Sequence, residues 1–153
     1  MDTVRLTIDG QEFKVRQGIT VLEAAQAAGI YIPALCADSD LEPYGACRVC
    51  VVEIDGMRGL PTACTTPVAE GMAVRTETPA VEQVRRTAVE LLIADHPGDC
   101  LTCPKNQRCE LQKVAADLGI TQQRLRKTTR LLPIDTSNPF FNLDRNYCIL
   151  CGR

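Results

Sequence analysis

The sequence has no tryptophan and only six aromatic residues among 153, which is little material for a large hydrophobic core. It also has a single histidine, and no apolar run approaches the roughly 18 residues that a membrane-spanning helix needs. The first residues lack both the basic and the apolar segment of a secretory signal. We therefore expect a cytoplasmic chain with no membrane span, unless a partner carries the export signal.

Basic residues are not in excess, since 17 Lys and Arg stand against 19 Asp and Glu. A nucleic-acid binder more often carries a basic face, so we expect no nucleic acid as a partner. The basic cluster within 124–130 is short, and we expect it to be a solvated or partner-facing surface. Apolar residues make up 45% of the chain, which indicates a folded protein.

Cysteine is the residue that the chain has in abundance, with nine copies. An odd number cannot all pair in disulfides, and in a reducing cytoplasm such a density indicates bound metal. Metal clusters would also supply the cross-links that a small, aromatic-poor domain needs.

Local patterns predict a chain of mixed α and β structure whose character changes near residue 78. Residues 3–16 alternate apolar and polar side chains around an Asp-Gly turn and predict a β-hairpin. Thr20 and Glu23 predict a capping box that begins a short helix, which Gly29 ends. A long loop is expected over 33–48, and strands over 49–54, 60–65 and 72–76.

The second half predicts two helices and much loop. Thr78 and Pro79 are typical of a helix start, and Gly119 of a helix end. The stripes expected to face the core are Val81, Val84, Ala88, Leu91 and Leu92 in the first helix, and Leu111, Val114, Ala115 and Leu118 in the second. A loop over 96–109 separates the helices, and 121–146 is expected to be mostly loop.

The first cysteine set is one Cys-x-x-Cys pair flanked by two distant single cysteines: Cys36, Cys47, Cys50 and Cys64. Zinc ribbons and fingers use paired doublets, whereas a 2Fe–2S cluster needs four thiolates and a loop that can close round the sulfides. Gly45 and Ala46 would let backbone N–H groups approach the sulfur. The spacing favours iron and sulfur over the alternatives, a zinc site or buried free cysteines.

The second set begins with the only histidine and comprises His96, Cys100, Cys103 and Cys109. A solitary histidine is more often an ordinary polar residue. However, a four-iron cube needs one protein ligand per iron, and only three cysteines lie here. The spacing alone leaves open a histidine-ligated 4Fe–4S cluster and a zinc site built from the same four residues.

A third pair, Cys148 and Cys151, opens the ferredoxin run C-x2-C-x2-C-x3-C-P, but the last two cysteines of that run are missing. We expect the chain to be a piece of a longer subunit, in which this pair would hold a further cluster. The alternative is a naturally short protein with two spare thiols.

The hairpin, the helix and the first two ligand sets, in this order and spacing, resemble the amino-terminal iron–sulfur region of a known enzyme family. Its members are NAD-linked formate dehydrogenases, iron-only hydrogenases and the large iron–sulfur subunit of respiratory complex I. The stretch 56–68 is most similar to the formate dehydrogenase alpha subunit. The resemblance implies an α+β fold, in which a small helical 4Fe–4S domain follows a β-grasp, 2Fe–2S ferredoxin-like domain.

The resemblance also implies the segments and the ligands. Residues 1–78 would be the β-grasp domain, 79–145 the histidine-ligated 4Fe–4S domain, and 146–153 the truncated start of a 4Fe–4S ferredoxin domain. The 2Fe–2S ligands would be Cys36, Cys47, Cys50 and Cys64, and the 4Fe–4S ligands His96, Cys100, Cys103 and Cys109. A neutral imidazole in place of a thiolate would make the cube less negative and raise its potential, as in Rieske centres.

The sequence offers no evident catalytic site. The sole histidine is assigned to the cube, the carboxylates of 38–42 and Asp55 lie in polar loops, and no glycine loop would cradle the phosphates of flavin or NAD. We therefore expect an electron-transfer segment of a multi-subunit NAD-linked oxidoreductase of the formate dehydrogenase alpha type. It would relay single electrons between a flavin- and NAD(H)-binding subunit and a catalytic metal centre, alongside other iron–sulfur subunits. Hydrogenase, diaphorase and complex I subunits are the alternatives within this class, and a zinc-binding interaction module is the alternative outside it.

Overall fold

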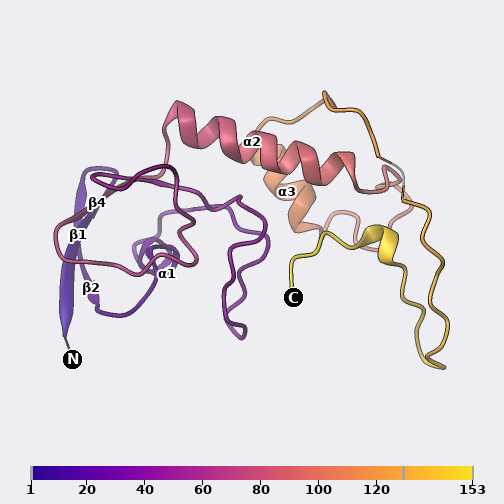
Figure 1. Ribbon diagram of the computed structural model, residues 1–153, viewed down its shortest axis with the longest axis horizontal. Helices are drawn as coiled ribbons and strands as arrows, with labels where there is room; N and C mark the ends of the chain where they lie inside the picture. The colour runs from indigo at the N-terminus through magenta and orange to yellow at the C-terminus, as the bar shows by residue number, and fades with distance from the viewer. Residues whose placement is uncertain (1, 129, 153) are drawn as a thin grey trace.

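The computed structural model describes residues 2–128 and 130–152. In this part of the chain a four-stranded mixed sheet and a short helix form one end of an elongated molecule (Figure 1). Two further helices and the C-terminal segment form the other end. The long loop over 33–48 lies between the two ends, as the colour bar of Figure 1 shows.

The sheet begins with the predicted hairpin, β1 (Thr3–Ile8) and β2 (Gln11–Arg16). The turn residues Asp9 and Gly10 both have positive φ, 50° and 80°, the conformation that a tight two-residue hairpin needs. β4 (Met72–Arg75) pairs parallel to β1, and β3 (Glu53–Ile54) pairs antiparallel to β4, which gives the order β2-β1-β4-β3. This is the α+β, β-grasp architecture that the sequence predicted.

Helix α1 (Val21–Ala27) covers the sheet and begins with the predicted capping box. The Glu23 N–H donates to the Thr20 hydroxyl at 3.2 Å, and the Thr20 N–H donates to the Glu23 carboxylate at 2.7 Å. The buried face of the helix, with Val21, Leu22, Ala24 and Ala25, packs against Val4, Leu6 and Ile8 of β1. This packing forms the core of the first half.

Two of the predicted strands are wrong in extent. Of the strand expected over 49–54 only β3 forms, and 60–65 forms no strand but a single bridge between Thr62 and Val51. The cysteine-bearing turns explain the difference. Arg48 adopts a positive φ of 57°, and 63–65 is a hydrogen-bonded turn, so neither segment stays extended. The strand at 72–76 is confirmed as β4.

Helix α2 (Pro79–Ala94) starts as predicted, with the Thr78 hydroxyl accepting from the Val81 N–H, but its buried face differs from the predicted one. Val84 and Leu91 are 38% and 57% exposed. The buried positions are instead Val81, Arg85, Val89, Glu90 and Ala94. The reason is tertiary, because the helix turns the Val89 face toward the long loop and α3, and leaves Val84 and Leu91 to line a groove.

Helix α3 (Glu110–Asp117) buries Leu111 and Val114, as predicted, and Gly119 ends it with a φ of +61°. These two side chains form one core cluster with Val89 of α2 and with Leu35 and Val49 from the first half. Side chains from both sides of residue 78 therefore share a core. The domain boundaries expected near 78 and 145 stay a prediction.

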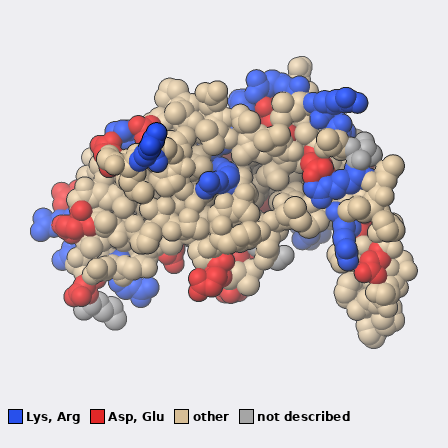
Figure 2. Space-filling model, in the orientation of Figure 1, with Lys and Arg blue, Asp and Glu red and all other residues tan. Residues whose placement is uncertain are grey.

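The segment after α3 is mostly irregular, as predicted, with one short 3-10 helix, η1 (Arg145–Tyr147). A β-bridge between Asp135 and Leu143 closes the base of a projecting loop. The tip of this loop shows no charged side chain in Figure 2, and Phe140 within the loop is 93% exposed. Arg130 is held to Asp95 at the end of α2 by an ion pair. Within the described residues, none of the helices has the length and apolar character required to cross a bilayer.

A second ion pair, between Arg124 and Glu90, joins this segment to α2 and should make the stability of the fold depend on pH. The Glu90 carboxylate, 1% exposed, accepts from Arg124 Nε and Nη2 at 2.8 and 2.7 Å, and these bonds hold the pKa of Glu90 below its ordinary 4.5. A lowered folded-state pKa stabilises the fold above the unfolded pKa, and that gain disappears as pH falls through the folded value. Glu90→Gln should therefore unfold a few degrees below the wild type at pH 7.

Thermal unfolding followed by circular dichroism between neutral and acid pH would check this. The difference between the two proteins should shrink as the pH falls below 4.5 and through the folded pKa of Glu90. A difference that is constant with pH would mean that the ion pair does not stabilise the fold.

Candidate metal centres

The four cysteines of the first set come together, although Cys64 lies on a segment apart from the other three. The thiol groups of Cys36 and Cys47 hydrogen-bond each other, as do those of Cys50 and Cys64. Cys36 and Cys47 also act electrostatically on Cys64, so the two pairs are neighbours. Cys36, Cys50 and Cys64 are at most 4% exposed, whereas Cys47 is half-buried.

Backbone hydrogen bonds hold the Cys64 segment in place. The Ala63 N–H donates to the Cys50 carbonyl at 2.9 Å, and the Val52 N–H donates to the Pro61 carbonyl at 3.0 Å. At the start of α1, the Leu22 N–H donates to the Ala63 carbonyl at 3.0 Å. Cys64 is thus fixed by both the Cys50 segment and the first helix.

The loop before the Cys47–Cys50 pair requires a glycine. Gly45 has a φ of +68°, and a Cβ added to it would lie 3.1 Å from Thr62 Oγ1 and 3.3 Å from Thr65 Cγ2. Any side chain here would press on the turn that carries Cys64. The prediction that small residues let the backbone close on this site is consistent with that geometry. Sequence inspection missed Thr62 and Thr65, whose hydroxyl oxygens lie 2.5 Å apart.

Hydrogen bonds in the site favour a thiolate at Cys50. The Cys64 thiol, and then the N–H groups of Cys64 and Ala63, lower the pKa of Cys50 to about 7 against its burial, while the same thiol pair raises the pKa of Cys64. Burial raises the pKa of Cys47, and N–H groups of Val49 and Leu35 oppose it. Thiolates are the ligands of iron, and N–H bonds to their sulfurs are typical of iron–sulfur sites.

In the second set, His96 is oriented as a metal ligand would be. It follows the end of α2, and its Nδ1 lies 2.9 Å from the Pro97 carbonyl oxygen. A carbonyl can only accept, so Nδ1 is the donor in this contact, and in the neutral imidazole the lone pair is then on Nε2, the nitrogen that could bind a metal. The ring also meets Tyr147 edge-on, with 5.7 Å between the ring centroids.

The cysteines of the second set lie on a loop of consecutive turns between α2 and α3. The Cys103 N–H donates to the Asp99 carbonyl at 3.1 Å, and Tyr147 Oη donates to the Asp99 carboxylate at 2.5 Å. That bond, followed by burial, raises the pKa of Tyr147 to about 12, and Cys103 is among the smaller influences on it. Cys109 precedes α3, and its thiol makes no capping hydrogen bond.

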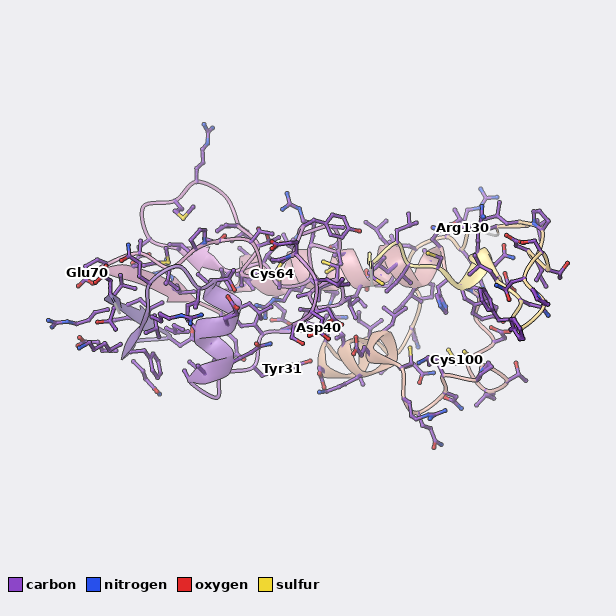
Figure 3. The ribbon with its side chains drawn as sticks, turned by 90° about the horizontal axis from the view of Figure 1, so that it is seen from below. Tyr31, Asp40, Cys64, Glu70, Cys100 and Arg130 are labelled. Atoms are coloured by element: carbon purple, nitrogen blue, oxygen red, sulfur yellow. The ribbon has the colours of Figure 1, made fainter. Side chains whose placement is uncertain are left out.

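The structure brings this second set together only in part. His96 and Cys103 both neighbour Tyr147, whereas no hydrogen bond or ring contact joins Cys100 or Cys109 to His96 within the described residues. Cys100 is exposed, and Figure 3 shows it well separated from Cys64 along the molecule. Over residues 2–128 and 130–152, no three His, Cys, Asp or Glu side chains are grouped closely enough to hold a single metal ion.

The third pair lies beside both sets, because Ile149 packs against the same core cluster as Cys47 of the first set and Cys109 of the second. The Tyr44 hydroxyl donates to the Leu150 carbonyl at 2.7 Å, and Arg130 Nη1 donates to the Cys148 carbonyl at 3.2 Å. Cys47 and Cys148 line one groove of about 660 Å³ together with the exposed face of α2. Cys151 is half-buried in the same segment.

Besides Thr62 and Thr65, three further polar residues near these sites escaped the sequence analysis: Asp99, Tyr147 and Arg85. Asp99 and Tyr147 are 48 positions apart, and no local pattern links them. Arg85 has a recognisable signal, because it lies one helical turn from both Val81 and Val89 and so interrupts an otherwise apolar face.

Comparison with known families agrees with this geometry. Residues 1–79, more than half of the chain, match the family described as "2Fe-2S iron-sulfur cluster binding domain". The chain belongs to this family. Residues 85–124 match the "NADH-ubiquinone oxidoreductase-G iron-sulfur binding region". The expected cofactors, a 2Fe–2S and a 4Fe–4S cluster, are confirmed, while the individual ligands stay a prediction.

Several proteins whose sequences are similar to this chain are subunits of oxidoreductases. It is 41% identical over 152 residues to an NADH-quinone oxidoreductase subunit of Rhizobium meliloti, and 40% identical over 150 residues to the alpha subunit of an NADPH-Fe(3+) oxidoreductase of Geobacter sulfurreducens. Each match covers 98% of this chain and 18% of the relative. A solved NAD+-reducing [NiFe]-hydrogenase matches with a TM-score of 0.91 and 38% identity, over 97% of this chain and 63% of its own.

Proposed function

We propose that this chain is an electron-transfer segment of a multi-subunit, NAD-linked oxidoreductase. It relays single electrons between a flavin- and NAD(H)-binding subunit and a catalytic metal centre. The observation that carries the proposal is the convergence of four largely buried thiols with N–H donors around their sulfurs, in a chain of the 2Fe–2S family. When bound, the clusters supply one-electron chemistry, and the chain holds them at fixed positions.

The proposal assigns each ligand to a residue. Cys36, Cys47, Cys50 and Cys64 hold the 2Fe–2S cluster, and His96, Cys100, Cys103 and Cys109 hold the 4Fe–4S cluster. The mutual contacts of the first four thiols support the first set. The hydrogen bond of His96 Nδ1 to the Pro97 carbonyl, which leaves Nε2 as the ligand atom of the neutral ring, supports the histidine of the second set. Cys148 and Cys151 would take part in a further cluster if the chain continues.

The parent enzyme is a finer proposal. The stretch 56–68 resembles formate dehydrogenase alpha, and we keep that parent as the first candidate. A complex I, diaphorase or hydrogenase subunit is the alternative, and the names of the relatives favour it. Sequencing the gene downstream of codon 153 distinguishes these, because a molybdopterin domain and the ligands of a hydrogen-forming cluster are different in sequence.

The partners and the compartment belong to the same proposal. The partners are the flavin- and NAD(H)-binding subunit and other iron–sulfur subunits, and the compartment is the cytoplasm. Nine free cysteines, which a reducing compartment would keep as thiols, support this location. Acidic and basic side chains are interspersed on the face shown in Figure 2.

Metal analysis tests the proposal directly. Ligand counting predicts two irons from the first set and four from the second, so the chain purified without oxygen should contain about six irons and no stoichiometric zinc. Elemental analysis together with acid-labile sulfide would measure this. One or two zinc ions per chain with negligible iron would replace the electron-transfer proposal with a zinc-binding interaction module.

A further inference from the structure

Arg85 is a buried cation that no carboxylate of the described residues pairs with. It lies on α2 between Val81 and Val89 and is only 6% exposed. Its Nη2 donates to the Val51 carbonyl at 2.8 Å. Its Nε is buried and has no hydrogen-bond partner within the part of the chain that the structure describes.

The guanidinium stays charged in this position. Burial lowers the pKa of Arg85, but an arginine side chain does not lose its proton in proteins. Holding an unpaired charge in an apolar core is costly, so the fold must supply a compensating negative charge. Attraction to the Cys50 thiolate opposes this lowering of the Arg85 pKa by burial, which is consistent with the hydrogen bond from Arg85 to the neighbouring Val51.

The proposed 2Fe–2S cluster would supply the negative charge that compensates Arg85. Val51, which receives the Arg85 hydrogen bond, is the neighbour of Cys50 in the chain, and Cys50 is itself fully buried. A 2Fe–2S cluster held by four thiolates is an anion, and it becomes one charge more negative when it is reduced. A fixed cation next to one of its ligands favours the more negative state, and burial protects this attraction from screening by salt.

We propose that Arg85 is a positioning residue that raises the reduction potential of the 2Fe–2S cluster by placing a buried positive charge beside Cys50. This inference rests on the proposed function, since it takes Cys50 as a cluster ligand. According to this inference, helix α2 helps to set the electron affinity of the 2Fe–2S cluster, although nearly all of the helix lies after residues 1–79, which match the 2Fe–2S family.

The test compares three variants in the whole chain prepared without oxygen. Arg85→Gln removes the charge but keeps a side-chain N–H donor for Val51, and Arg85→Lys keeps the charge. Arg86→Gln is the matched control, because Arg86 is the next residue of α2 and donates to a different carbonyl, that of Leu118, at 2.6 Å. The readout is the midpoint potential of the 2Fe–2S electron paramagnetic resonance signal, titrated with dithionite, with the 4Fe–4S signal as internal reference.

Arg85→Gln should lower the equilibrium constant for one-electron reduction of the 2Fe–2S cluster at least tenfold, a shift of about 59 mV. Arg85→Lys and Arg86→Gln should stay within tenfold of the wild type, and the 4Fe–4S potential should not move in any variant. An unchanged potential in Arg85→Gln overturns the inference, as does an equal shift in Arg85→Lys.

Failure of an Arg85 variant to assemble the 2Fe–2S cluster would also test the inference. If Arg85→Gln does not assemble the cluster while Arg85→Lys does so near the wild-type potential, the charge is required, as proposed. If both variants lose it, Arg85 acts through packing and the inference is wrong. A wild-type chain with no 2Fe–2S signal would instead contradict the proposed function, so the two failures are distinguishable.

Discussion

Replacing Cys64 with serine is expected to abolish the 2Fe–2S signal while the 4Fe–4S signal survives. The Cys64 thiol is 1% exposed and hydrogen-bonds Cys50, and backbone bonds from Ala63 to Cys50 and from Leu22 to Ala63 fix its segment. A serine hydroxyl in the same position is a poor iron ligand, because it does not ionise near neutral pH. The other three cysteines keep their loop, but one iron is left open to solvent, and the whole two-iron cluster should then be lost.

Iron content and electron paramagnetic resonance of the reduced protein measure the effect. Iron should fall from about six to about four per chain, with the remaining signal that of the four-iron cluster. Cys148→Ser is the matched control, since it makes the same chemical change at an exposed cysteine outside both proposed ligand sets. If both signals survive Cys64→Ser unchanged, Cys64 is not a ligand and another residue must complete the first set.

Features of the fold set by neighbours in sequence could be predicted. The hairpin follows from alternation around Asp9 and Gly10, and the start of α1 from the reciprocal bonds of Thr20 and Glu23. The end of α3 follows from a glycine with positive φ at position 119. In each case the deciding interaction spans only a few residues, so local sequence contains the information.

Features set by contacts between distant segments could not be predicted. The β-branched run at 49–54 indicates a strand, yet only two of its residues, Glu53 and Ile54, form β3, because the Cys47–Cys50 turn and its pairing with the Cys64 turn bend the chain. On α2, hydropathy alone placed Val84 and Leu91 in the core. The helix instead buries Arg85, whose hydrogen bond to Val51 spans 34 positions.

The same distinction applies to the candidate sites. Cysteine spacing was sufficient to propose both ligand sets, because the ligands of a cluster are few and chemically distinctive. The surroundings that tune them come from elsewhere in the chain: Arg85 reaches the first set from α2, and Tyr147 reaches His96 from η1. Neither residue belongs to a motif, and although Arg85 interrupts the apolar face of α2, only the three-dimensional arrangement shows what the two residues contact.

The largest effect on the second cluster is expected from His96. His96→Ala removes the only non-cysteine ligand of the proposed set and leaves one iron open to water, so the cube should lose that iron and yield a three-iron signal. His96→Cys supplies a thiolate instead and adds one negative charge. The cube should then persist with a lower potential, because the reduced state carries more uncompensated charge in a half-buried site.

A redox titration of the four-iron signal in the wild type and both variants checks these outcomes, with Cys148 and Cys151 changed to serine throughout so that they cannot recruit stray iron. Tyr147→Phe is the matched control for packing. It keeps the ring that meets His96 edge-on and removes only the hydroxyl that donates to Asp99, so the cube should stay intact. An intact cube with an unchanged midpoint potential in both His96 variants would show that Nε2 is not a ligand. The hydrogen bond between Nδ1 and the Pro97 carbonyl would then serve only to orient the ring after the end of α2, and the fourth iron would need another residue.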